Sequence, residues 1–256
     1  MTVPRYALEL AYRGTNYAGW QRQPNALSVE ETIDTALSTV LGEPIKIVGC
    51  GRTDAGVHAS DYVAHFDFPG DLPPRLLARL NRYLPDDIAL YRLCRVPEDF
   101  HARFSATARS YVYRISLRKD PFRTDTVAWL PAYRDLDLSA MAVAAESLLG
   151  FGEFAPFCKT NNDAFTMRCE LTESAWEFGA EELVYRVSAN RFLRGMVRLI
   201  VGSCLQVGTG KLSLERLQAS LERQERLPRP LSAPAAGLFL TAVTYDGRTE
   251  WPEVSY

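Results

Sequence analysis

The sequence predicts an α+β fold in which two halves repeat the element order β-α-β-β-α-β. Apolar, β-branched strands and amphipathic helices alternate in that order over residues 6–96 and again over residues 111–245. The 256 residues, 47% hydrophobic and 23% charged, are typical of a folded globular chain. We therefore expect two ferredoxin-like halves, residues 1–100 and 101–256, that share a broad, mainly antiparallel sheet with a central cleft.

In the first half, strands are expected at residues 6–12, 45–48, 62–68 and 88–96. Ser28 and Glu31 form a capping box that opens a helix, and Gly42 ends it. A second helix is expected after Pro73 and Pro74, before the last strand of this half.

In the second half, strands are expected at residues 111–117, 171–178, 182–189 and 237–245. An Ala-rich helix is expected over residues 138–149. Asn190 is expected to cap a long helix that runs to Val207, and Ser213 to cap another.

Composition narrows the class of protein. The N-terminus has no apolar signal-peptide core, and no uncharged stretch is long enough to span a membrane, so the cytoplasm is the expected compartment. The five cysteines are odd in number and none has C-x-x-C spacing, so neither a disulfide framework nor a zinc site is indicated. His58 and His65 have no further ligands at metal spacing, which favours structural hydrogen bonding, and we expect no metal.

The charge leaves the partner undecided. A net charge of −2 argues weakly against a nucleic acid as the partner. However, only four of the 29 basic residues are lysines. Because arginine binds phosphate in a bidentate manner and stacks on bases, a local arginine surface is compatible with an acidic remainder.

The most informative segment is the loop of residues 51–60, GRTDAGVHAS, between two expected strands. Its two glycines permit close approach of the backbone, and Asp54 follows Arg52 by two residues. A loop at the end of a rigid strand is a suitable place for a catalytic carboxylate. The alternative is an ordinary turn in which Asp54 bonds its own backbone and Arg52 is solvated.

Two further segments combine cations with aromatic residues. Arg103, Arg109 and Tyr111 lie at the junction of the halves, in a pattern that suits phosphates and bases. On the expected helix after residue 190, Arg191, Arg194 and Arg198 have the spacing i, i+3, i+7 and form one stripe. The alternatives are ordinary strand aromatics in the first segment and a solvated helix face in the second.

Five motifs, in order along nearly the whole chain, resemble those of the TruA-type tRNA pseudouridine synthases. The most specific is GRTDAGVHA at residues 51–59. The others are the segments of residues 12–21, 100–106 followed by Tyr111, 190–203 and 233–238. The pair Arg194-Gly195 departs from the family pattern, which bears on contacts with RNA and not on the chemistry.

The resemblance implies an isomerase that makes pseudouridine at positions 38–40 of the tRNA anticodon arm, without cofactor or metal and as a homodimer. It assigns Asp54 as the catalytic nucleophile and Arg198 as its basic partner. It further assigns Arg52 to flipping the target nucleotide, Tyr111 to stacking on the target base and Leu238 to the base pocket. We expect Arg103, Arg109, Arg191 and Arg194 to contact the RNA.

Two other functions use the same residues. A non-catalytic RNA-binding module is one, and an intact set of Asp54, Tyr111 and Arg198 argues against it. A nucleosidase is the other, although a glycoside hydrolase normally needs a second carboxylate. The residues leave open whether Asp54 attacks C1′, attacks C6 or abstracts a proton, and which group is the base at C5.

Overall fold

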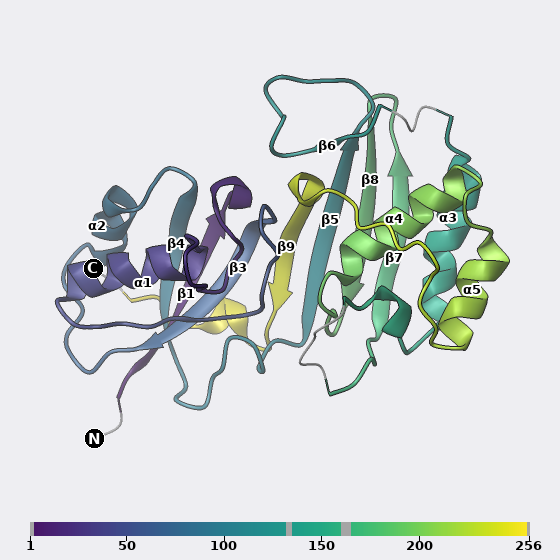
Figure 1. Cartoon of the computed structure of the whole chain (residues 1–256). Coiled ribbons are helices and arrows are strands. Elements are labelled where there is room, and N and C mark those ends of the chain that lie inside the picture. The colour runs from purple at the N-terminus through teal and green to yellow at the C-terminus, as the bar shows by residue number, and fades with distance from the viewer. Residues whose placement is uncertain (1–2, 132–134, 160–164, 255–256) are drawn as a thin grey trace. The chain divides into compact units, whose positions relative to one another are not determined.

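The computed structural model describes residues 3–131, 135–159 and 165–254. The chain forms two compact units, residues 1–107 with 240–256 and residues 108–239. Each unit combines antiparallel strands with helices, so the α+β prediction is confirmed (Figure 1). The last strand, β9 (Leu238–Thr244), begins in the second unit and continues in the first.

The first unit contains strands in the order β4-β1-β3-β9. The central β1 pairs antiparallel with both β3 and β4, and a short β2 pairs with β3. Helices α1 and α2 cover one face of these strands (Figure 1). The bounds are β1 (Arg5–Tyr12), α1 (Val29–Leu41), β2 (Val48–Gly49), β3 (His58–Asp67), α2 (Leu76–Tyr83) and β4 (Ile88–Val96).

Helix α1 begins and ends where the sequence indicates. The Ser28 hydroxyl accepts the Glu31 N–H at 3.2 Å, and Gly42 ends the helix in the left-handed region at φ 77°. Ile33 and Leu37 point into the core and are fully buried. The local chemistry of the cap and of the glycine therefore sets both ends of this helix.

The strand expected at residues 45–48 is mostly absent, because only Val48 and Gly49 join the sheet. The Ile45 N–H instead donates to the Ser38 hydroxyl at 2.8 Å, and the Ile47 N–H donates to Asp34 Oδ1 at 2.8 Å. Side chains of α1 thus take the backbone donors that a ladder would use. Both isoleucines are nevertheless buried.

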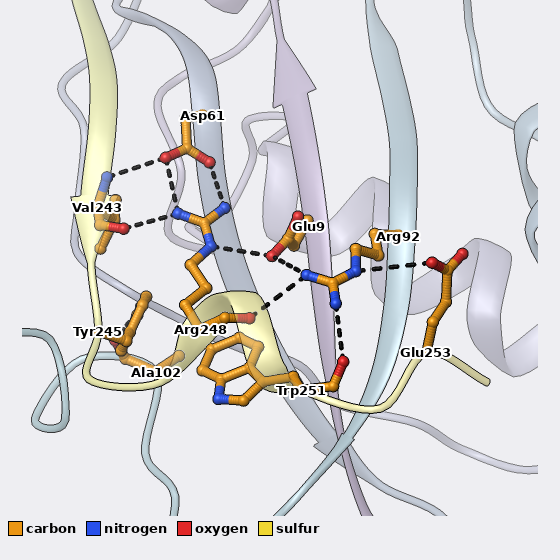
Figure 2. Close-up of polar contacts among 9 residues, drawn as sticks. All are labelled: Glu9, Asp61, Arg92, Ala102, Val243, Tyr245, Arg248, Trp251 and Glu253. Atoms are coloured by element: carbon orange, nitrogen blue, oxygen red, sulfur yellow. Dashed lines mark hydrogen bonds and ion pairs between the residues drawn. The ribbon is translucent and has the colours of Figure 1, made fainter.

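The face of the first unit opposite the helices is covered by the C-terminal segment (Figure 2). This segment leaves β9, crosses the strands through the single turn Arg248–Glu250, and reaches the edge strand β4. There the Arg95 N–H donates to the Pro252 carbonyl at 3.0 Å, and the Val254 N–H donates to the Leu93 carbonyl at 2.9 Å. The segment up to Val254 is therefore part of the first unit.

The second unit contains strands in the order β5-β8-β7, with neighbours antiparallel, and a short β6 parallel to β5. Ser213 caps α5 as expected, since its hydroxyl accepts the Arg216 N–H at 3.2 Å. No helix within the described ranges is long and apolar enough to cross a bilayer. The bounds are β5 (Ala108–Ser116), β6 (Ala128–Trp129), α3 (Leu138–Ser147), β7 (Leu171–Phe178), β8 (Glu182–Ala189), α4 (Met196–Gly208) and α5 (Leu214–Glu222).

Helix α4 begins at Met196, so the prediction that Asn190 caps it is wrong. Asn190 extends the pairing of the strands instead. Its Oδ1 accepts the Glu170 N–H at 3.0 Å, and its own N–H donates to the Glu170 carbonyl at 3.2 Å. Gly195, in the left-handed region at φ 72°, then turns the chain into the helix.

The late start of α4 also overturns the predicted arginine stripe. Arg191 and Arg194 lie in the turn before the helix, and only Arg198 lies within α4. Helix α2 of the first unit starts in the same manner, after the left-handed Arg75 at φ 58°. This shared entry geometry, which no sequence identity indicates, supports the view that the two halves repeat one pattern.

Candidate active site

The loop that carries Asp54 is held from beneath by hydroxyl groups. The Tyr62 hydroxyl donates to the Gly51 carbonyl at 2.5 Å, and the hydroxyl groups of Tyr12 and Thr53 lie 2.9 Å apart. Both tyrosines are buried, while Asp54 is partly exposed. The backbone before Asp54 is thus held by Tyr12 and Tyr62, and the backbone after it is held by the Gly56 N–H, which donates to the Tyr17 carbonyl at 3.3 Å.

A stack of aromatic rings supports these hydroxyl groups. The rings of Trp20 and Tyr62 are stacked with centroids 4.0 Å apart, and Tyr12 meets Tyr62 edge-on at 5.5 Å. All three side chains are at most 4% exposed. Since close-packed aromatic rings resist displacement, the floor beneath the loop is rigid.

The segment of residues 14–20 packs directly on the loop. The Trp20 N–H donates to the Thr53 carbonyl at 3.2 Å. Gly19 has φ +101°, and a Cβ built on it would lie 2.4 Å from the Thr53 oxygen. Only glycine permits this approach, so Gly19 fixes the backbone immediately before Asp54.

The histidines hydrogen-bond to the backbone, as the sequence predicts. His58 Nδ1 accepts the Gly14 N–H at 3.1 Å, and His65 Nδ1 accepts the Ala102 N–H at 3.1 Å. Both side chains are buried. Burial, followed by the nearby Arg5 charge, lowers the pKa of His65 to about 4. His65 is therefore neutral near pH 7 and acts as a structural acceptor.

A cavity of about 150 Å³ lies beside the loop. Trp20 and Gly49 contribute to its apolar lining, while Arg52, from the loop itself, and Arg103 add cationic groups. Arg52, expected to flip the target nucleotide, and Arg103, expected to contact the RNA, thus line the same space. The lining residues are Trp20, Gln21, Glu30, Val48, Gly49, Gly51, Arg52 and Arg103.

In the second unit, Tyr111 lies on β5 beside the turn that precedes α4. Its ring meets the ring of Phe192 edge-on, with centroids 5.0 Å apart. Arg109, two residues earlier, donates to the Asn190 carbonyl at 3.1 Å. The structure therefore places Tyr111, Arg109 and the turn that contains Arg191 at one end of the strands.

Arg198 is tied to the segment that leads into Leu238. Its Nε donates to the Ala233 carbonyl at 2.6 Å, and the Ala233 N–H donates back to the Arg198 carbonyl at 3.0 Å. The Tyr113 hydroxyl donates to the next carbonyl, of Pro234, at 2.8 Å. Burial raises the pKa of Tyr113, which the Arg198 charge partly offsets. Tyr113 is thus a structural residue that supports this segment.

The predicted site residues divide between the two units. Asp54, Arg52 and Arg103 belong to the first unit and cluster around the loop and its cavity. The second unit contains Arg109, Tyr111, Arg191, Arg194, Arg198 and Leu238. Sequence reasoning missed the supports beneath the loop, although the glycines and aromatics of residues 12–20 were a readable signal of close packing.

Comparisons with known proteins place the chain among tRNA-modifying enzymes. The family model described as tRNA pseudouridine synthase matches residues 10–105 and 144–246. A tRNA pseudouridine synthase A from Porphyromonas gingivalis is 46% identical over 95% of this chain and 98% of its own length. The Bacteroides fragilis protein of the same name is 44% identical over 96% and 98%, and that of Beijerinckia indica is 43% identical over 97% and 96%.

One solved structure that resembles the chain is too distant to describe its fold. A crystal structure of an unknown protein from Galdieria sulphuraria covers 82% of this chain and 94% of that chain at 10% identity. Its TM-score of 0.22 is too low to indicate a shared architecture.

The chain belongs to the tRNA pseudouridine synthase family. It is an isomerase that converts uridine to pseudouridine in tRNA.

Proposed function

We propose that this enzyme forms pseudouridine at positions 38–40 of the tRNA anticodon arm, with Asp54 as the catalytic carboxylate, and that it works in the cytoplasm. The observation that carries the proposal is the loop of residues 51–59, which matches the family motif and is fixed on both sides of Asp54. A carboxylate held in one place is a requirement for covalent or electrostatic catalysis at a sugar carbon.

The reaction moves one bond within the substrate. The N1–C1′ glycosidic bond breaks, the uracil turns, and a C5–C1′ bond forms. The proton lost from C5 is balanced by a proton gained at N1, so no atom or electron is exchanged with a cofactor. An ionised Asp54 would stabilise a cationic sugar or form an adduct with the substrate. The proposal includes the three roles that the sequence leaves open for Asp54, which are attack at C1′, attack at C6 and abstraction of a proton.

The remaining residues take the roles that the family resemblance gives them. Arg198 would keep Asp54 ionised, because a neighbouring cation favours the charged form of a carboxyl group. Arg52 and Tyr111 would offset the cost of unstacking the target base, a few kcal/mol. Leu238, buried at the start of β9, would contact that base. Arg103, Arg109, Arg191 and Arg194 would contact phosphates.

We further propose a homodimer in which one tRNA touches both subunits. A chain with a net charge of −2 has little overall attraction for RNA, so it must gather its arginines locally. Binding should weaken steeply with salt, and charge reversal at Arg191 or Arg194 should reduce that slope. An active monomer with full tRNA affinity at the assay concentration, seen by light scattering, would contradict the dimer.

Tritium release from tRNA labelled at uracil C5 tests the activity. An isomerase releases tritium and leaves pseudouridine in the RNA, and mapping should place it at positions 38–40. A binding module without activity releases none. A nucleosidase leaves abasic sites without pseudouridine, so the three outcomes are distinct. Pseudouridine confined to positions outside the anticodon arm would contradict the proposed target.

A further inference from the structure

A tight turn in the first unit holds an aromatic ring out in solvent. Phe104 is 74% exposed, although it follows the buried Ala102 by only two residues. His101 folds this turn: its Nδ1 accepts the Arg103 N–H at 3.2 Å, and its carbonyl accepts the Ser105 N–H at 2.8 Å. The Ser105 hydroxyl accepts the His101 N–H at 2.9 Å. The hydrogen bonds of this turn therefore fix the backbone of Phe104 in a conformation that exposes its ring.

The exposed ring adjoins a cation. The Arg103 guanidinium carbon lies 5.5 Å from the centroid of the Phe104 ring, and the His101 ring lies 4.3 Å from it on a tilted plane. Most of the Phe104 surface remains open to solvent. A ring that stays in water contributes no free energy of burial to folding. A ligand that covers the Phe104 ring would remove this apolar surface from water, which favours binding.

Arg103 connects this ring to the cavity beside the Asp54 loop. The same side chain lines that cavity together with Arg52. Glu30, the one carboxylate in the lining, accepts the Arg22 backbone N–H through Oε2 at 2.8 Å, so one of its oxygens is already held by a local donor. An aromatic platform and a cationic cavity therefore lie side by side in the unit that carries Asp54.

This pairing has the two features that a single nucleotide needs. Bases of any identity stack on an aromatic face, and arginine beside the ring adds a cation–π contribution. The adjacent phosphate requires cationic donors, which Arg52 and Arg103 supply in the cavity. A protein ligand would satisfy the ring but has no need of the two arginines.

We propose that Phe104 and Arg103 form a subsite for one unpaired nucleotide of the bound tRNA, distinct from the target uridine. Its base stacks on the Phe104 ring, and its phosphate lies between Arg103 and Arg52. This proposal rests on the proposed function, since the occupant is a nucleotide of the same substrate. The subsite holds the RNA and takes no part in the chemistry.

The test uses the full-length enzyme and an anticodon stem-loop RNA with 2-aminopurine at one unpaired position at a time. Four proteins are compared: wild type, Phe104→Ala, Phe104→Trp and Tyr91→Ala. Tyr91, 62% exposed on β4 of the same unit, is the control for loss of an exposed aromatic residue. Circular dichroism and thermal unfolding verify that each variant is folded.

One labelled position should be quenched by wild type and by Phe104→Trp but not by Phe104→Ala. Removing the ring should weaken RNA binding about tenfold, within the range for loss of one stacked base. The single-turnover rate at saturating RNA should stay within about twofold of wild type. Tyr91→Ala should behave as wild type in every measurement.

Two results would overturn the subsite. One is unchanged affinity and quenching in Phe104→Ala, which would make Phe104 an ordinary exposed residue. The other is a slower saturated rate with unchanged affinity, which would indicate a role in folding the turn. Failure of the proposed function is separable, because wild-type enzyme would then bind the stem-loop without forming pseudouridine in it.

Discussion

Arg248 forms a two-pronged ion pair with Asp61 on the face of the first unit opposite the helices (Figure 2). Nη1 lies 2.8 Å from Oδ2, and Nη2 lies 2.6 Å from Oδ1. The same guanidinium donates from Nε to Glu9 at 2.9 Å and from Nη1 to the Val243 carbonyl at 2.6 Å. The hydrogen bonds that Arg248 donates to Asp61 and Glu9 raise its pKa further, so it is charged at every accessible pH.

This pair joins segments that are far apart in the sequence. Asp61 lies on β3, directly after the Asp54 loop, and its Oδ2 also accepts the Val243 N–H of β9 at 2.9 Å. Arg92 extends the network by donating to the Trp251 carbonyl at 2.7 Å (Figure 2). The ion pairs and hydrogen bonds of Arg248 and Arg92 therefore connect the C-terminal segment to β3, β1 and β4.

Arg248→Met should lower the free energy of unfolding by about 3–5 kcal/mol, because it leaves two partly buried carboxylates without their main partner. The control is Arg118→Met, since Arg118 pairs with Glu181 at 3.2 Å with its side chain 71% exposed. That change should cost at most about 1 kcal/mol. Urea denaturation of both variants measures the difference. Equal losses would mean that the network adds nothing beyond a surface ion pair.

Gly19→Ala should disturb the Asp54 loop, because the new Cβ would meet the Thr53 carbonyl at 2.4 Å. We expect a single-turnover rate about 10- to 100-fold lower, as for a displaced catalytic group. Gly42→Ala is the matched control, since Gly42 also has positive φ but has nothing within 4 Å of the added Cβ. It should cost about 1 kcal/mol of stability and leave the rate unchanged. Equal rates for both variants would show that the loop tolerates the shift.

The parts of the fold that the sequence predicted depend on local chemistry. The Ser28 and Ser213 caps and the Gly42 stop use hydrogen bonds and backbone conformations within a few residues. The Asp54 loop was likewise recognisable, because its glycines and charges lie within one short string. Such features can be predicted because their causes are adjacent in the chain.

The predictions that were wrong depend on partners distant in the sequence. Ile47 alternates like a strand residue, but its N–H is taken by Asp34 of α1. Asn190 resembles a helix cap, but the side chain and the backbone N–H of Asn190 both hydrogen-bond to the backbone of Glu170. Asp61 and Arg248 are 187 positions apart in the sequence, and no sequence pattern predicts that they form an ion pair. The tertiary structure decides which of several local preferences a residue satisfies.

His65→Asn should flatten the dependence of stability on pH. The pKa of His65 is about 4 in the folded chain and about 6.5 when unfolded, so protons bind the unfolded chain more tightly. Wild-type stability from this group is full above about pH 6.5 and is lost as the pH falls through 4. Asparagine keeps an acceptor for the Ala102 N–H but binds no proton.

Urea unfolding at pH 7 and pH 4.5 measures this effect. Wild type should lose about 1–3 kcal/mol more than His65→Asn between these two pH values. His101→Asn is the comparison, because burial lowers the pKa of His101 but its side chain is only partly buried. Its effect should be smaller. Parallel losses in wild type and His65→Asn would mean that His65 does not titrate on unfolding.

Asp54→Asn should fold and bind tRNA but release no tritium from uracil C5. The side chains have the same shape, so the change removes the negative charge and turns one acceptor oxygen into an NH2 donor without altering the volume. The supports beneath the loop involve Thr53, Gly51 and Gly19, and none of these contacts uses the Asp54 carboxylate. Turnover within about tenfold of wild type, equivalent to about 1.4 kcal/mol of barrier, would remove Asp54 from the catalytic role.

Arg198→Met should lower the single-turnover rate at saturating tRNA by about 100-fold or more, because the proposed partner of the Asp54 carboxylate is lost. Methionine is a good helix former of similar length, so α4 should persist. The variant also loses the Nε hydrogen bond to the Ala233 carbonyl, a structural contact that a lower rate alone would not separate from the electrostatic role.

The pH–rate profile separates the two roles. If Arg198 favours the ionised form of Asp54, its removal raises the pKa of that carboxyl, and the acidic limb of the profile shifts to higher pH. Loss of the Ala233 contact alone would lower the rate evenly at all pH values. Arg198→Lys keeps the charge without the same hydrogen-bond geometry, so its acidic limb should stay close to that of wild type even if its rate falls. An unshifted limb in Arg198→Met would leave Arg198 as a structural residue of the second unit.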